Sequence, residues 1–126
     1  MEMIIGGAFQ GKSTYAQKCY PQIKWSSGWS VSEDELYRAQ GILGFHEFIR
    51  REMKDGRDVK DLAGKLMEKN PDVILVSDEV GYGVVPVDPF DRAYRETVGR
   101  ICTELASFST RVTRVVCGIG TVIKNA

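Results

Sequence analysis

A glycine-rich octet near the N-terminus constrains the fold of this chain more than any other feature. The residues Gly6-Gly7-Ala8-Phe9-Gln10-Gly11-Lys12-Ser13 fit the pattern GxxxxGK[ST]. An apolar run, Met3-Ile4-Ile5, precedes the octet, and helix-compatible residues follow it from Lys12 to about Cys19. Glycines in such a loop let successive backbone N–H groups turn inward around phosphate oxygens. The order of strand, loop and helix therefore predicts a phosphate-binding loop.

The polar members of this loop have separate predicted roles. Lys12 neutralises the β- and γ-phosphate charges, and Ser13 offers its hydroxyl to Mg²⁺. We expect the loop and the first helical turn to bind a nucleoside triphosphate, GTP or ATP, through Gly6, Gly7, Ala8, Phe9, Gln10, Gly11, Lys12, Ser13 and Thr14. The alternative is a glycine-rich turn that carries an exposed lysine.

A second candidate region follows the aliphatic run at residues 73–76, which predicts a strand buried in a parallel sheet. The run leads into Asp78 and Glu79, and the carboxyl ends of parallel strands lie at the sheet edge that holds the phosphate loop. Asp78 or Glu79 is expected to hold Mg²⁺ or its water shell, or to accept a substrate proton. Adjacent carboxylates point in different directions, so we expect at most one to reach the metal. The alternative is a solvated acidic loop.

Predicted strands and helices alternate along the chain. A weaker strand is expected near residues 23–25, a helix start at Ser32, and helices from Ile42 to Met53 and over residues 59–69. Asp88-Pro89 begins a long helix, and residues 112–117 form a strand that Gly118-Ile119-Gly120 ends. The pattern predicts an α/β P-loop three-layer sandwich with a mostly parallel central sheet of about four or five strands. At 126 residues, the chain is expected to form one domain over 1–126.

Isolated side chains give weaker candidates. His46 lies on the apolar side of its predicted helix, where a packed histidine is favoured over a catalytic one. Arg95, one turn before Gly99, is a candidate phosphate contact, with a surface role as the alternative. Gly81 and Tyr82 follow Glu79 and are candidates for contacting a ligand, Tyr82 through its ring.

Composition excludes several classes of function. Lys plus Arg and Asp plus Glu each number 17, so the chain has no net charge to attract nucleic acid or an anionic membrane. Apolar runs are far shorter than the roughly 20 residues of a membrane helix, and no signal-peptide pattern occurs, so we expect a cytoplasmic protein. Three separated cysteines and one histidine favour neither a disulfide framework nor a zinc site.

Four segments together resemble the adenosylcobinamide kinase/adenosylcobinamide-phosphate guanylyltransferase family. They are the loop GGAFQGKS, the block DEVGYGVVP at 78–86, the helix motif RAYRETVGR at 92–100 and the ending VTRVVCGIGTVIK at 112–124. The three later blocks are far more specific than a phosphate loop, and the match is almost continuous from about Val73 onward.

The resemblance implies a RecA-like sheet and a cobalamin-pathway enzyme that phosphorylates the aminopropanol hydroxyl of adenosylcobinamide, a corrinoid. Gly6, Gly11, Lys12 and Ser13 would bind the triphosphate, and Glu79 with residues 80–83 would border the site. Full-length members also transfer GMP from GTP through a histidine-linked intermediate, for which His46 is the one histidine of this chain. Members assemble as trimers, which implies a homo-oligomer with the trimer as its expected state.

Two alternatives to a corrinoid kinase stay open. One is a non-catalytic GTP- or ATP-binding relative with a regulatory or structural role. It is motivated by the greater length of family members between the first helix and Val73, and by Phe9-Gln10 where the family commonly has Arg-Ser. The other is a P-loop kinase for a different small alcohol.

Overall fold

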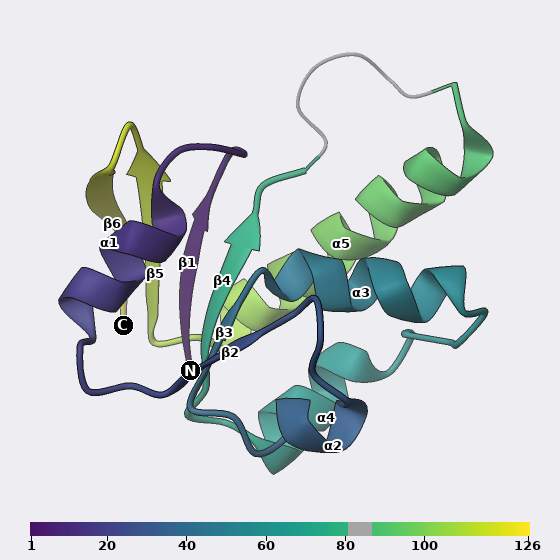
Figure 1. The fold of residues 1–126 in the computed structure, drawn as a ribbon, viewed down its shortest axis with the longest axis horizontal. Coiled ribbons are helices and arrows are strands. Elements are labelled where there is room, and N and C mark those ends of the chain that lie inside the picture. Colours follow the sequence, from purple (N-terminus) through teal and green to yellow (C-terminus); the bar gives the residue numbers. More distant parts are fainter. Residues whose placement is uncertain (81–86) are drawn as a thin grey trace.

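The structure is a computed structural model that describes residues 1–80 and 87–126, and a central sheet organises it (Figure 1). Along the chain, the elements are β1 (Glu2–Gly6), α1 (Lys12–Cys19), β2 (Trp25–Ser27), α2 (Glu33–Leu36), β3 (Gly41–Leu43), α3 (Phe45–Lys54), α4 (Leu62–Lys69), β4 (Ile74–Asp78), α5 (Pro89–Phe108), β5 (Arg111–Val116) and β6 (Ile119–Asn125).

Within the described residues, the sheet has six strands in the order β2-β3-β4-β1-β5-β6. Every neighbouring pair is parallel except β5 and β6, which are antiparallel. The register of β1 and β4 pairs Gly6 with Asp78, so the start of the glycine-rich loop lies beside the acidic end of β4. The predicted α/β fold with a mostly parallel sheet is confirmed.

Helices cover both faces of the sheet, and alternating residues of each strand meet different helices. Met3, Leu75 and Val112 pack in one core with α3, α4 and α5, whereas Ile4, Val76 and Val115 pack on the other face with Ala16 of α1. Figure 1 shows α1 in front of β5 and β6, to the left of β1 and β4, and α3, α4 and α5 to the right of β4. The carboxyl ends of β1 and β4 therefore have α1 on one face of the sheet and α5 on the other.

Helix starts follow the capping signals of the sequence. Asp88 accepts a hydrogen bond from the backbone N–H of Phe90 at 2.8 Å, and Pro89 occupies the first position of α5. At α2, Ser32 and Glu35 form a capping box. Both predicted starts are confirmed. In the described part of the chain, no helix is both long and apolar enough to cross a membrane.

Two of the predicted helices begin later than expected. Ile42, the expected first residue of a helix, lies fully buried in β3, and α3 starts only at Phe45. Gly44 separates them in the left-handed conformation at φ +70°, which glycine adopts without strain. The three-residue spacing of Ile42 and Phe45 suggested one helix, but Ile42 belongs to β3 and Phe45 to α3. The helix expected over 59–69 likewise begins only at Leu62.

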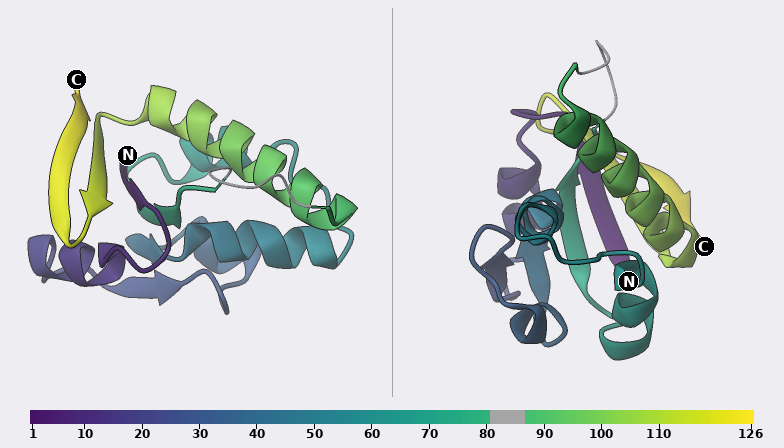
Figure 2. Two further views of the ribbon diagram at one scale, coloured as in Figure 1. Left: turned by 90° about the horizontal axis from the view of Figure 1, so that it is seen from above. Right: turned by 90° about the vertical axis from the view of Figure 1, so that its right-hand side faces the viewer.

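The strand β6 was not predicted, because the glycines of residues 118–120 indicated an end of regular structure. In the structure, Cys117 (φ 51°) and Gly118 (φ 75°) form the turn of a hairpin whose second strand is β6. Positive φ at two consecutive residues matches the twist of a two-residue hairpin turn. Figure 2 shows β6 running alongside β5 at the outer edge of the sheet, so the sheet is larger than the four or five strands expected.

Candidate functional site

The phosphate loop connects β1 to α1, and its backbone requires glycine at two places. A Cβ atom at Gly6 would lie 2.4 Å from the carbonyl oxygen of Val115, so β1 and β5 approach too closely there for any other residue. Gly11, directly before α1, has φ +82°. The loop therefore leads directly into the N-terminus of α1, the end of a helix whose backbone N–H groups favour anions.

Lys12 faces the acidic end of β4. Its Nζ atom lies 2.6 Å from Oδ1 of Asp78 and donates a hydrogen bond at 2.7 Å to the carbonyl oxygen of Gly7. Only 8% of Lys12 is exposed, so the ammonium group is held by these two partners rather than by solvent. The motif lysine and the strand-end carboxylate thus form one ion pair, which a bound phosphate group would have to rearrange.

His46, at the start of α3, contacts the same carboxylate. The backbone N–H of Asp78 donates to Nδ1 of His46 at 3.0 Å, so the neutral ring carries its proton on Nε2. That Nε2 lies 3.3 Å from Oδ2 of Asp78 and 3.5 Å from Oε1 of Glu47. Burial lowers the pKa of His46 and outweighs the Asp78 and Glu47 carboxylates, which raise it. The neutral imidazole therefore contacts Oδ2 and the backbone N–H of Asp78, whereas Lys12 contacts Oδ1.

These groups line a cavity of about 420 Å³, which we call the phosphate-loop cavity. Its lining residues are Ala8, Phe9, Gly11, Lys12, Ser13, Thr14, Trp29, Gly44, His46, Glu47, Val76 and Asp78. Ser13 and Asp78 supply hard oxygen donors, and Mg²⁺ in such sites typically takes one or two protein ligands with phosphate oxygens and water. The donor set fits a Mg²⁺ ion that accompanies a triphosphate.

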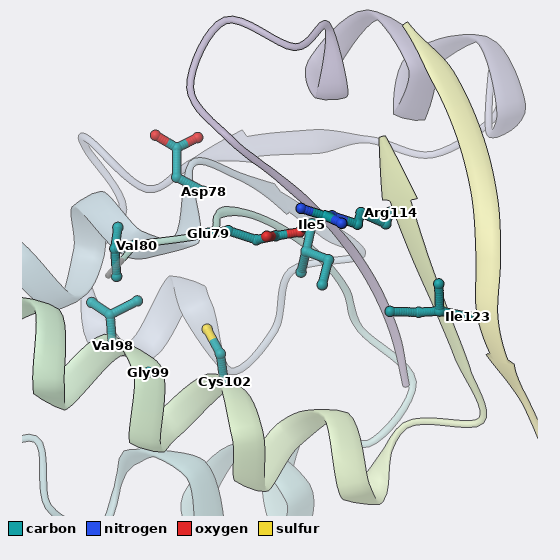
Figure 3. Close-up of a pocket in the computed structure, with 9 residues that line it drawn as sticks. All are labelled: Ile5, Asp78, Glu79, Val80, Val98, Gly99, Cys102, Arg114 and Ile123. Atoms are coloured by element: carbon teal, nitrogen blue, oxygen red, sulfur yellow. Dashed lines mark hydrogen bonds and ion pairs between the residues drawn. The ribbon is translucent and has the colours of Figure 1, made fainter. Parts of the chain in front are cut away.

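A second cavity of about 420 Å³ lies between the sheet and α5, and we call it the α5-side cavity (Figure 3). Its lining residues are Ile5, Asp78, Glu79, Val80, Val98, Gly99, Cys102, Arg114 and Ile123. Arg114 donates through Nε to Oε1 of Glu79 at 2.9 Å. Figure 3 shows Asp78 pointing away from this ion pair, so the two adjacent carboxylates serve different sides of the β4 end.

Comparison with known proteins adds evidence that is independent of the loop. Residues 45–123 match the family model described as cobinamide kinase / cobinamide phosphate guanyltransferase. That range covers more than half of the chain. The chain belongs to this cobinamide kinase family. The matched range begins after the phosphate loop, so the loop motif and the family match are separate observations.

Two relatives in the cobinamide kinase family share a shorter stretch with the chain. The "bifunctional adenosylcobalamin biosynthesis protein CobU" of Escherichia coli (strain K12) is 44% identical over 52 residues. Its namesake from Salmonella typhimurium (strain LT2) has the same identity over the same length. The match covers 41% of this chain but only 29% of each relative.

The structure brings most of the predicted site residues of this family member together, but not all of them. Ala8, Phe9, Gly11, Lys12, Ser13, Thr14, His46 and Asp78 share the phosphate-loop cavity, and Glu79 lines the α5-side cavity. Arg95 lies on α5 among the lining residues of neither cavity. Gly81 and Tyr82 lie outside the described residues.

Gln10 has a different environment from its neighbours in the loop. Its side-chain oxygen accepts a hydrogen bond from the backbone N–H of Cys117 at 2.7 Å, and its carbonyl oxygen accepts one from Gly118 at 2.8 Å. The loop is therefore tied to the β5–β6 turn. Phe9, by contrast, is fully exposed at φ +61°, a conformation uncommon outside glycine.

Sequence reasoning missed the residues that reach the cavity from the segments directly after β2 and β3. Trp29 lies with its ring edge toward His46 at a centroid distance of 6.1 Å. A Cβ at Gly44 would lie 2.3 Å from the Trp29 ring, so this glycine lets the indole lie against the backbone. The proximity of Gly28-Trp29 to Gly44 arises from the pairing of two short parallel strands, which no local pattern indicates.

Proposed function

We propose that the chain is a nucleoside-triphosphate-dependent kinase that phosphorylates a hydroxyl group of a cobinamide. The observation that carries this proposal is the ion pair between Lys12 and Asp78, which joins the phosphate loop to the end of the neighbouring parallel strand. Membership of the cobinamide kinase family supplies the substrate class.

The phosphate-loop cavity holds the donor. Backbone N–H groups of the loop bind the phosphate oxygens, and Lys12 exchanges its contact with Asp78 for the β- and γ-phosphates. Ser13 and Asp78 hold Mg²⁺, directly or through its water shell. Mg²⁺, when bound, supplies neutralisation of charge on the transferring phosphoryl group. The cavity accepts GTP or ATP, since the contacts proposed here involve only the triphosphate.

The transfer step needs an acceptor hydroxyl beside the γ-phosphate. The hydroxyl oxygen forms a bond to the γ-phosphorus while the bond from phosphorus to the bridging oxygen breaks. The electron pair stays on the nucleoside diphosphate, and the hydroxyl proton passes to the Glu79 carboxylate and then to water. Glu79 is given this role because its carboxylate, paired with Arg114, lines the α5-side cavity, whereas Asp78 is assigned to Mg²⁺.

His46 acts in this proposal as a positioning residue for Asp78. A nucleophilic imidazole must offer a lone pair to phosphorus, but Nδ1 accepts from the Asp78 N–H and Nε2 carries the proton. Only 6% of His46 is exposed. The geometry therefore favours phosphoryl transfer over GMP transfer through His46.

Mass spectrometry of adenosylcobinamide incubated with the protein, Mg²⁺ and either ATP or GTP tests the proposal. We expect a mass increase of one phosphate with the unmodified protein and none with Lys12→Ala. Lys18→Ala, which changes an exposed lysine of the same helix, is the matched control and should retain activity. Nucleotide binding without corrinoid modification would refute the kinase proposal and favour a non-catalytic relative or a different alcohol substrate.

The assembly stays a prediction. We propose a homo-oligomer, with the trimer as its expected state, and sedimentation equilibrium at working concentration measures it directly. A single monomeric species would contradict this expectation.

A further inference from the structure

We propose that the α5-side cavity receives a short aliphatic chain that carries the acceptor hydroxyl, and that Gly99 keeps the cavity open. This inference rests on the proposed kinase function and assigns the acceptor a place that the phosphate loop cannot provide.

The walls of the cavity match an alkyl alcohol. Four aliphatic side chains line it, contributed by β1, the end of β4, α5 and β6: Ile5, Val80, Val98 and Ile123. The Glu79–Arg114 ion pair adds hydrogen-bonding groups at one side (Figure 3). A volume of about 420 Å³ is ample for a short arm but far too small for a corrinoid macrocycle. Only the arm of a large acceptor enters.

The cavity lies where an acceptor must approach the donor. Asp78 lines both the α5-side cavity and the phosphate-loop cavity, so the end of β4 is their common wall. The backbone N–H of Glu79 donates to the carbonyl oxygen of Gly6 at 2.7 Å, which fixes this wall against the start of the phosphate loop. A hydroxyl delivered past Glu79 thus meets a phosphoryl group held by Lys12.

Gly99 is the residue that packing does not explain. Glycine in the interior of a helix costs about 1 kcal/mol relative to alanine. A Cβ atom at Gly99 would have no atom of the described residues within 4 Å, so close packing against residues 1–80 and 87–126 does not require glycine here. Because Gly99 lines the cavity, any side chain at this position would take up part of its volume.

Cys102 is an inert part of the same wall. Burial raises the pKa of its thiol to about 11, and its Sγ atom lies 3.9 Å from Oγ of Ser77. A protonated thiol at this depth is a weak nucleophile. The cavity therefore binds the acceptor without a covalent step of its own.

The test is a pair of matched substitutions, Gly99→Leu and Gly64→Leu. Gly64 lies in α4, lines neither cavity, and likewise has no described atom within 4 Å of the place where a Cβ would lie. We expect both variants to melt no lower than the unmodified protein, because leucine favours helix. Gly99→Leu should raise KM for adenosylcobinamide by about tenfold or more while KM for the nucleotide stays unchanged. Gly64→Leu should change neither constant. An unchanged KM for the corrinoid in folded Gly99→Leu would overturn the proposal.

A binding measurement separates this inference from the kinase proposal. The probe is N-acetyl-1-amino-2-propanol, an amide-linked alkyl alcohol, titrated into ¹⁵N-labelled protein with a non-hydrolysable triphosphate analogue. We expect amide shifts at Val98, Gly99 and Cys102 that Gly99→Leu abolishes and Gly64→Leu retains. Such shifts without corrinoid phosphorylation would support the cavity and refute the kinase. Absence of these shifts in a protein that phosphorylates the corrinoid would refute the cavity and retain the kinase.

Discussion

The two cavities beside Asp78 have similar volumes but contrasting origins. The phosphate-loop cavity takes six of its lining residues from positions 8–14, a continuous segment that one motif encodes. The α5-side cavity draws its lining from β1, β4 and the residues after it, α5, β5 and β6. The first contains the motif lysine and the hydroxyls of Ser13 and Thr14, whereas the second combines four aliphatic side chains with the Glu79–Arg114 ion pair.

The two cavities differ in origin because binding a phosphate and binding an apolar arm need different surroundings. Binding of phosphate needs backbone N–H groups and a cation in fixed positions, which a short loop can provide by itself. A cavity for an apolar arm needs walls that surround it, and walls come from elements far apart in the sequence. A change at the common wall should therefore affect both cavities, whereas changes on either side should separate them.

Asp78→Asn removes the charge of the common wall and has the largest expected effect. Lys12 loses its ion-pair partner and Mg²⁺ loses a carboxylate, so kcat should fall by about 10²- to 10³-fold. Steady-state kinetics against Mg²⁺ concentration measures this loss. Asp72→Asn, in the exposed turn before β4, is the control. Wild-type Mg²⁺ dependence in Asp78→Asn would contradict a role of Asp78 in holding the metal.

Glu79→Gln should affect only the acceptor side. Loss of the proton acceptor lowers kcat by about 100-fold, while nucleotide affinity stays unchanged. Arg114 is half exposed, so breaking its ion pair with Glu79 should cost less than about 1 kcal/mol of stability. Calorimetric titration of the nucleotide and single-turnover kinetics provide the two readouts, with the exposed Glu68→Gln as the control. Equal losses of nucleotide affinity and turnover would contradict the proposal that Asp78 serves the nucleotide and Glu79 the acceptor.

Thiol labelling measures the α5-side cavity and the β5–β6 turn in the same sample, because each has a cysteine. Cys102 lines the α5-side cavity, whereas Cys117 lies in the exposed turn that holds the phosphate loop. Raising the pKa of Cys102 from 9.0 to about 11 reduces its thiolate at pH 8 by about 100-fold. The greater nucleophilicity of a more basic thiolate recovers part of that, leaving its reaction about tenfold slower. Labelling with a disulfide reagent should show Cys19 and Cys117 reacting first, and the Cys102 rate should rise with pH up to about 11. Three equal rates would show that the α5-side wall opens readily.

Gln10→Ala should have the smallest effect and confine it to the phosphate loop. The Cys117 N–H loses its side-chain acceptor, while the hydrogen bond from the Gly118 N–H to the carbonyl oxygen of residue 10 remains. A lost hydrogen bond of about 1 kcal/mol corresponds to nucleotide affinity about fivefold weaker. Affinity for the corrinoid should not change. Gln17→Ala, exposed on α1, controls for the loss of a glutamine, and a weaker corrinoid affinity in Gln10→Ala would couple the two cavities.

Much of the scaffold was predictable because its signals are local. The strand before the phosphate loop, the aliphatic run of β4 and the Asp88-Pro89 start of α5 each depend on a few consecutive residues. The errors fell where a tertiary contact overrides a local pattern. Ile42 belonged to a strand because β3 pairs with β2 and β4, and β6 formed because the Cys117-Gly118 turn folds it back onto β5.

Local patterns were enough to predict the phosphate loop, the position of Asp78 at a strand end and the mostly parallel α/β sheet. The sequence left the two acidic residues equivalent, did not predict that Gly99, Cys102 and Arg114 line one cavity, and did not predict that Trp29 lines the other. Only the tertiary structure paired Glu79 with Arg114, 35 residues away, and placed His46 against Asp78. This contrast follows from the distance along the chain over which each kind of interaction acts. Glycine conformations, caps and apolar runs act within a few residues, whereas ion pairs and cavity walls depend on which strands and helices become neighbours.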